Sequence, residues 1–120
     1  MVTTLVTGSL MAGSDLFTGS LDLLILKALQ WGPLHGYAIG RWIRQWTDAV
    51  LIVQEGALYP ALHRLEKREL LSEEWGISDT NREVKFYTLT RSGRLQLRRE
   101  SARFGDYARV MTAALAAARP

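Results

Sequence analysis

The sequence predicts a mainly helical α+β domain, and three patterns along the 120-residue chain indicate this fold class. Apolar residues recur every three or four positions in three successive stretches between residues 18 and 68, the spacing of amphipathic helices. Two short stretches with alternating or β-branched residues follow and enclose the turn-forming residues 79–82. A last helical pattern runs from residue 91 toward residue 117. We therefore expect three helices, a β-hairpin and one long final helix.

The composition is that of an ordinary globular domain with a basic balance. Apolar residues make up 48% and charged residues 22% of the chain, which is long enough for one domain. The net charge is +3, and 12 of the 15 basic residues are arginine, which suits contacts to phosphate and guanine. The absence of cysteine excludes disulfides and thiolate sites. With no apolar run of membrane-spanning length and no basic leader, we expect a cytoplasmic protein without a membrane partner.

The first helix is expected from Thr18 or Ser20 to Trp31, where Gly32-Pro33 ends it. Residues 1–14, rich in Thr, Gly and Ser, predict a flexible N-terminal arm. The core stripe of this helix holds Leu21, Leu24, Ile25, Ala28 and Leu29. A second apolar stripe of Leu16, Leu23 and Leu26 lies roughly opposite. In so small a chain, we expect a second subunit to cover that stripe.

The second helix is expected from Leu34 to Thr47. Its inward residues are Ile39, Trp42, Ile43 and Trp46, and its outward residues are Arg41, Arg44 and Asp48. Tyr37 begins the outward side, where its hydroxyl and the positive end of the helix can both meet a phosphate. Alternatively, Tyr37 only flanks the core.

The central helix covers residues 55–68 and buries Leu58, Ala61, Leu62 and Leu65, which follow the i, i+3, i+4, i+7 spacing. Pro60 is tolerated near the start of a helix, so the helix should begin between Glu55 and Ala57, with the proline ring against the carbonyl of Gly56. The opposite side is small at first and rich in donors further on, as a helix in the major groove requires. That side holds Gly56, Pro60, His63, Arg64 and Lys67, with Tyr59 at its border. The alternative is a surface helix with a solvated basic side.

The hairpin is expected from two strands, residues 71–78 and residues 84–89. In the first strand Leu71, Trp75 and Ile77 alternate with polar residues, which is typical of a half-buried strand. Arg82 and Lys85 lie at or near the tip. A plain surface hairpin is the alternative.

The final helix starts at Thr90, the expected N-cap, and carries a seven-residue repeat. The repeat is formed by Leu97, Ser101, Phe104, Ala108, Met111, Leu115 and Ala118. A helix of about 40 Å is longer than the preceding domain can cover, so a partner helix is expected on this stripe.

This order of elements predicts a winged helix-turn-helix domain at residues 15–90, followed by a C-terminal dimerisation helix at residues 91–120. The residues then expected to face the major groove are Gly56, Ala57, Tyr59, Pro60, His63, Arg64 and Lys67. Arg82 and Lys85, on the hairpin that forms the wing, are expected to face the DNA backbone or minor groove.

Five blocks of sequence resemble the PadR-like transcriptional regulators. They are residues 21–26 (LDLLIL), 32–39 (GPLHGYAI), 55–66 (EGALYPALHRLE), 74–76 (EWG) and 85–93 (KFYTLTRSG). The short C-terminal part resembles the branch of the family with a single dimerising helix.

The resemblance implies a homodimeric DNA-binding regulator, usually a repressor, on a two-fold symmetric operator. Phenolic acids or hydrophobic drugs release some members of the family from DNA. The residues implied to contact the operator are Tyr37, Tyr59, Pro60, His63, Arg64 and Lys67. The first and last helices are implied to form the dimer, through Leu16, Leu23, Leu26, Leu97, Phe104, Ala108, Met111 and Leu115.

Two positions depart from the pattern of the family. Glu69 stands where the central helix usually ends at a glycine, so we expect a differently shaped helix end. Glu83 and Val84 interrupt the basic residues of the wing, so we expect fewer contacts from the wing to phosphate.

Trp31 and Phe104 are the best candidates for contacts to an aromatic effector, because they lie near the expected dimer seam. Trp42 and Trp46 are instead expected in the core. A winged-helix module that binds protein or RNA is the main alternative to an operator-binding protein. Nothing supports an enzyme, a cofactor or a metal, since His35 and His63 lie far apart without a matching carboxylate or nucleophile motif.

Overall fold

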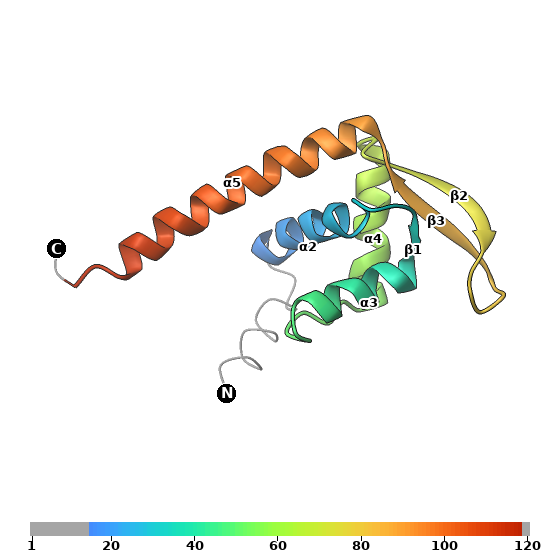
Figure 1. Cartoon of the computed structure of the whole chain (residues 1–120), viewed down its shortest axis with the longest axis horizontal. Helices are drawn as coiled ribbons and strands as arrows, with labels where there is room; N and C mark the ends of the chain where they lie inside the picture. Colours follow the sequence, from blue (N-terminus) through green and yellow to red (C-terminus); the bar gives the residue numbers. More distant parts are fainter. Residues whose placement is uncertain (1–14, 119–120) are drawn as a thin grey trace.

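The computed structural model describes residues 15–118, with side chains from residue 19 onward, so the expected arm at residues 1–14 lies outside the described residues. Its elements, labelled as in Figure 1, are α2 (Asp15–Ala28), β1 (Leu34–His35), α3 (Gly36–Trp46), α4 (Glu55–Lys67), β2 (Leu71–Ile77), β3 (Glu83–Leu89) and α5 (Arg91–Leu115). This is the predicted winged helix-turn-helix order with a long C-terminal helix. None of the described helices is long and apolar enough to cross a membrane.

α2 is the central helix of the core, because α3, α4 and α5 all pack against it. Four of the five residues of its predicted core stripe are buried, and Leu24 is half-buried. Leu26, predicted as a dimer contact, is only 2% exposed and belongs to the core. That prediction is wrong because neighbours within the same chain already cover its side chain. Leu23 packs partly buried at the edge of the core, and the side chain of Leu16 lies outside the described part.

The start of α3 is set by the sheet. Leu34 pairs with Tyr87 and His35 with Phe86, so these two residues form β1 instead of the first turn of the expected helix. His35 then caps α3, and its Nδ1 accepts a hydrogen bond of 3.1 Å from the backbone N–H of Ala38.

The inward face of α3 is formed by Ile39 and Ile43, which are fully buried. Trp46, predicted in the core, is 67% exposed, and that prediction is wrong. Aliphatic side chains fill the space beneath α3, so the indole ring lies on the surface, 6.3 Å from the ring of the half-buried Trp42.

α4 begins at Glu55 and buries Leu58, Ala61, Leu62 and Leu65, as predicted. Its end is closed by two backbone hydrogen bonds, from Leu70 N–H to Leu65 O and from Glu69 N–H to Glu66 O. Glu69 adopts a left-handed conformation with φ 61°, so the expectation of a differently shaped helix end is wrong. A glutamate takes the conformation usually given to glycine.

The wing is formed by β2 and β3, which pair antiparallel in a sheet of order β1-β3-β2. Leu71, at the base of β2, is buried against the core, whereas Trp75 and Ile77 are each 62% exposed. The prediction of a half-buried β2 therefore holds only at its base. Further out, the wing extends beyond the helices, which no longer cover it (Figure 1).

α5 starts at the predicted N-cap, where Thr90 Oγ1 accepts a 2.9 Å hydrogen bond from Gly93 N–H and donates one of 2.7 Å to Glu69 O. A Cβ atom at Gly93 would collide with the carbonyl oxygen of Leu70. The backbone at the start of α5 therefore packs directly against the backbone that follows α4. Leu97, predicted as a dimer contact, is 7% exposed and packs into the domain core. The C-terminal half of α5 extends past the domain (Figure 1).

Candidate nucleic-acid interface

The outer face of α4 is exposed over its whole length. Tyr59 is 46% exposed, and four further predicted DNA contacts, Gly56, Pro60, His63 and Lys67, are also exposed. Ala57, predicted on the same face, packs partly buried against the core. Because the opposite side of α4 lies in the core, this face has a fixed orientation toward solvent.

Tyr59 is held where the start of α3 meets α4. A Cβ atom at Gly36 would lie 2.7 Å from the Tyr59 hydroxyl, so the phenol ring packs directly on the backbone at that glycine. Tyr37, the next residue, is 71% exposed. The guanidinium carbon of Arg41, one turn later, lies 5.5 Å from the centre of the Tyr37 ring. The first two turns of α3 and of α4 thus present two phenols and one cation to the same cleft.

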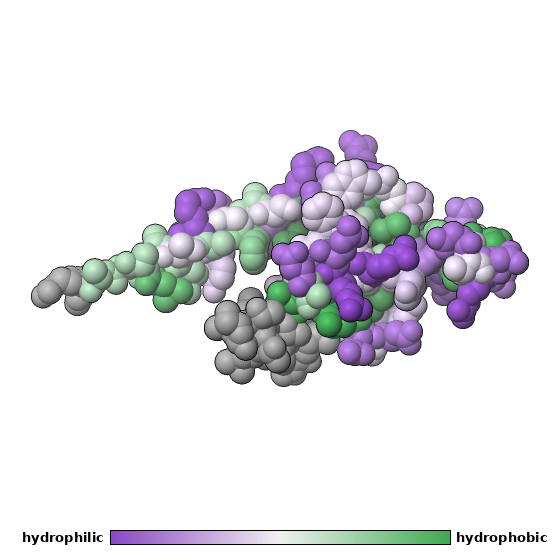
Figure 2. All heavy atoms as spheres, turned by 60° about the horizontal axis from the view of Figure 1, so that its bottom comes forward, coloured by the Kyte–Doolittle hydropathy of each residue, from purple (hydrophilic) through white to green (hydrophobic). Residues whose placement is uncertain are grey.

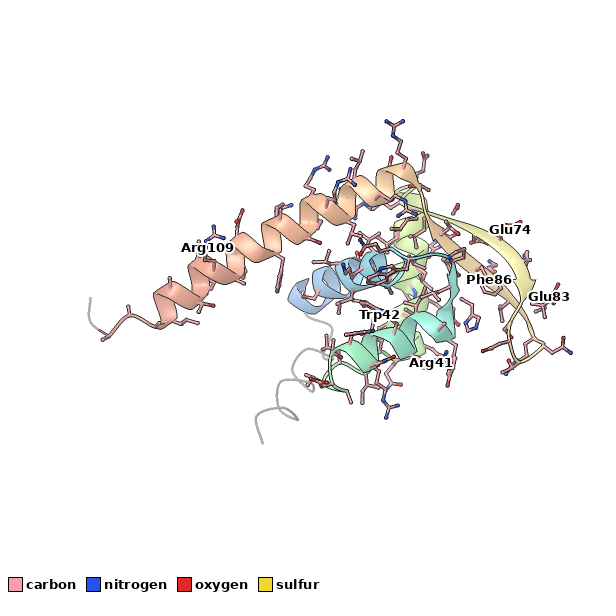
Figure 3. All side chains as sticks on the ribbon, in the orientation of Figure 1. Arg41, Trp42, Glu74, Glu83, Phe86 and Arg109 are labelled. Carbon is pink, nitrogen blue, oxygen red and sulfur yellow. The ribbon has the colours of Figure 1, made fainter. Side chains whose placement is uncertain are left out.

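A cleft of about 780 Å³ separates these turns from the wing. Its lining includes Tyr37, Arg41, Tyr59, Trp75, Arg82 and Lys85. Figure 3 shows Arg41 extending from α3 and Glu83 near the outer end of the wing. Arg41 and Trp75 were not predicted as site residues. From the sequence, Arg41 was expected only as an outward residue of its helix, and Trp75 only as an apolar residue of a half-buried strand.

The basic residues of the wing differ in their surroundings. Arg82 is exposed at the end of the hairpin. Lys85 Nζ lies 3.0 Å from the Glu73 carboxylate and 5.5 Å from the centre of the Trp75 ring. The Glu73 carboxylate raises the pKa of Lys85 above its usual value. Lys85 is therefore already paired, whereas Arg82 extends toward solvent.

Comparison with known protein families identifies the family to which the chain belongs. A model of the transcriptional regulator PadR-like family matches residues 25–99, more than half of the chain. The chain belongs to the PadR-like family of transcriptional regulators. An uncharacterized protein of Lysinibacillus sphaericus is 31% identical over 87 residues, which cover 72% of this chain and 80% of that protein.

Two solved structures are similar in fold to this PadR-like protein. A transcriptional regulator from Clostridium thermocellum has 29% sequence identity and a TM-score of 0.74, covering 83% of this chain and 97% of that one. A PadR family transcription regulator from Clostridium difficile R20291 has 27% identity and a TM-score of 0.70, covering 79% and 97%. The protein is thus a DNA-binding transcriptional regulator, of a family of regulators and not of enzymes.

Arg64 of the PadR-like protein lies at the flank of α4. Its Nη2 lies 2.9 Å from Asp22 Oδ1 on α2, and the two side chains are 43% and 19% exposed. Burial raises the pKa of Asp22, while the guanidinium groups of Arg64 and Arg68 act to lower it. This pair was not predicted, because its members are 42 positions apart in the sequence.

The remaining predicted dimer contacts lie on the projecting half of α5. Phe104 is 53%, Met111 38% and Leu115 80% exposed, and Ala108 is half-buried. Figure 2 shows hydrophilic residues over the centre of the molecule and the wing, and apolar residues along this half of α5.

Trp31, predicted as an effector contact, is 68% exposed in the turn after α2. Its ring centre lies 6.0 Å from that of Trp42, and Lys27 Nζ lies 5.0 Å from the ring centre. Trp31, Trp42 and Trp46 therefore form a continuous aromatic surface on α3 and the preceding turn.

Proposed function

We propose that this PadR-like regulator is a cytoplasmic homodimeric repressor that binds a palindromic operator and is released by a small hydrophobic or aromatic effector. The observation that supports this proposal best is the outer face of α4. It is exposed, rich in donors and fixed in orientation by the buried stripe behind it.

Base recognition falls to the outer face of α4. Gly56 and Pro60 are small and exposed at its beginning, which allows close approach to the edges of the major groove. His63 follows one turn later and can donate to a base acceptor. Lys67, a further turn along, is suited to a phosphate at the edge of the groove.

The cleft beside the wing is suited to one strand of the DNA backbone. Tyr37 and Arg82 border it from opposite sides, and both are exposed. Lys85 contributes positive potential from within its pair with Glu73. Such contacts fix the position of the protein on the duplex and leave sequence recognition to α4.

Dimerisation falls to the projecting half of α5. Phe104, Met111 and Leu115 present an apolar stripe that the described domain does not cover. Two copies that pair along this stripe, with Leu23 of α2 at its edge, would place two α4 helices on one face. The two half-sites would then lie about one helical turn of DNA apart.

The effector is proposed to bind at Trp31 and Phe104. Both rings are exposed. Arg94, in the first turn of α5, donates a 3.3 Å hydrogen bond to Gln30 O beside Trp31, and Phe104 follows about 15 Å further along α5, so the two rings are separate candidate contacts. A flat aromatic ligand stacked on either ring would alter the packing of the dimerisation helix on the DNA-binding domain.

The test is selection of bound DNA from a random pool with the purified protein at two salt concentrations. We expect a palindrome with half-sites about one helical turn apart, enriched at both salt concentrations. If no sequence is enriched and binding vanishes at moderate salt, only nonspecific electrostatic attraction remains. A winged-helix module that binds another protein would then explain the fold better.

A further inference from the structure

The ion pair between Asp22 and Arg64 joins the central helix of the core to the DNA-facing helix. It is 2.9 Å long and links α2 to α4. The other ion pairs found among the described residues connect adjacent strands of the wing or successive turns of α5. The Asp22 pair therefore differs from them in fixing a side chain of α4 from a different helix.

Arg64 is placed to the side of the surface that faces the major groove. At 100° per residue it lies about 70° from the centre of the outer face, on the side toward α2. A guanidinium has five N–H donors, and the bond to Asp22 Oδ1 uses one nitrogen. The side chain is 43% exposed, so the other donors face solvent at the edge of α4. A DNA phosphate beside the major groove would lie at that edge.

Resting on the proposed function, we propose that Asp22 is a positioning residue for DNA binding, which holds the Arg64 guanidinium at the edge of α4 for contact with a phosphate. A free arginine loses much rotamer freedom when it contacts DNA. In this protein that loss occurs on folding, before DNA arrives. The resulting contact is independent of base sequence.

In the alternative arrangement, DNA would compete with Asp22 for Arg64 and break the ion pair. The burial of the Asp22 carboxylate argues against this alternative. The Asp22 side chain is only 19% exposed. If Arg64 moved away, a largely buried carboxylate would keep only the more distant charge of Arg68. The pair is therefore retained while the free donors of Arg64 bind.

The test is Asp22→Asn, because a positioning role and a simple charge effect predict opposite changes in operator affinity. Removal of a negative charge near DNA should strengthen binding on Coulomb grounds. Positioning instead predicts an operator Kd about tenfold weaker, since the neutral amide oxygen of asparagine leaves Arg64 at most a weaker hydrogen bond without charge assistance. Binding that is unchanged or tighter would overturn the proposal. The matched control is Asp106→Asn, which removes the carboxylate from the 3.0 Å pair with Arg109 on α5 and should leave Kd unchanged.

A double-mutant cycle separates positioning from general stability. Arg64→Ala should weaken binding, and adding Asp22→Asn to it should cause no further loss. An equal loss in both backgrounds would mean that Asp22 acts on the fold and not through Arg64. If Asp22→Asn fails to fold by circular dichroism, Asp22→Glu keeps the charge and displaces the guanidinium. It should still weaken binding, and wild-type affinity would overturn the proposal.

The same variants are measured on a random-sequence 30-base-pair duplex at low salt, because a phosphate contact also contributes to nonspecific binding. A wild-type protein that enriches no palindrome but binds this duplex would contradict the operator proposal alone. In that case the effect of Asp22→Asn on the duplex still decides the role of Asp22. A wild-type protein that binds neither DNA would overturn both proposals.

Discussion

Glu66 of α4 and Glu73 of β2 bring two carboxyl groups together where the wing meets the DNA-facing helix. Burial, and then the hydrogen bond and negative charge of Glu73, raise the pKa of Glu66 to about 7. The pKa of Glu73 is lowered by its hydrogen bonds with Glu66 and Lys85. Around pH 6 the pair therefore shares one proton, which an unfolded chain would have lost.

This shared proton predicts a pH dependence of stability. The pKa of Glu66 is about 7 when folded and 4.5 when unfolded, so its contribution is complete below pH 4.5 and is lost as pH rises to about 7. Glu66→Gln keeps the shape of the side chain and has no proton to lose. The variant should therefore lose less stability than the wild type between pH 5 and pH 8, measured as free energy of unfolding in urea.

The matched control for this prediction is Glu74→Gln. Glu74 is exposed on β2, next to Glu73, and pairs across the sheet with Phe86 (Figure 3). This variant should keep the pH dependence of the wild type. Equal pH dependence in the wild type and Glu66→Gln would contradict the shared proton.

Glu69 provides a second prediction at the scale of one residue. Its φ of 61° places a side chain where glycine has no steric penalty. Glu69→Gly should therefore raise the free energy of unfolding by about 1 kcal/mol. Glu69→Ala removes the same carboxylate but keeps the Cβ atom, and it should change stability little. Equal stability of the two variants would show that backbone strain at this position is negligible.

At the scale of elements, the sequence was most informative where periodicity and capping act together. The start of α4 at Glu55 and the N-cap at Thr90 follow from local chemistry and are confirmed. Trp46 and Trp75 were wrongly expected to be buried, because periodicity gives the apolar side of an element but not how far its neighbours extend. Leu26 was misassigned for the opposite reason, since three helices cover α2.

The outer face of α4 was predictable from the same apolar periodicity. Once the buried stripe of α4 is known, Tyr59, His63 and Lys67 must lie on its other side. The pair of Arg64 with Asp22 could not be predicted, because it depends on how two helices pack. The roles of Arg41 and Trp75 in the cleft depend on the position of the wing relative to α3.

The outer face of α4 yields a prediction about salt dependence. Lys67→Ala should weaken binding to all DNA sequences, because Lys67 is proposed to neutralise one phosphate. A plot of log affinity against log salt should become shallower by about 0.9. Lys27→Ala removes the same residue type from α2, away from this face, and should leave the slope unchanged. An unaltered slope for Lys67→Ala would remove Lys67 from the interface.

At the scale of the molecule, α5 makes the chain elongated. The radius of gyration is 15.9 Å, against about 13 to 14 Å for a compact domain of this length. The longest dimension is 57 Å, because half of α5 projects from the domain. A lone projecting helix with an apolar stripe is costly in water, which favours a paired state.

This shape predicts the effect of a charge on the α5 stripe. Met111→Asp should raise the dissociation constant of the dimer by roughly two orders of magnitude, because the carboxylate would be buried without a partner. Sedimentation velocity measures the change. Arg109→Asp introduces the same residue on the outer side of α5 (Figure 3) and should remain dimeric. A Met111→Asp variant that sediments as an intact dimer would place the interface elsewhere.

The claim that α4 reads the operator is tested most directly by repeating the random-pool selection with His63→Ala beside the wild type. We expect the same palindrome from both proteins, with preference lost at one symmetric pair of positions. The loss should amount to about 1 to 3 kcal/mol of discrimination per position. Identical base preferences at every position would contradict base recognition by His63 on the outer face of α4.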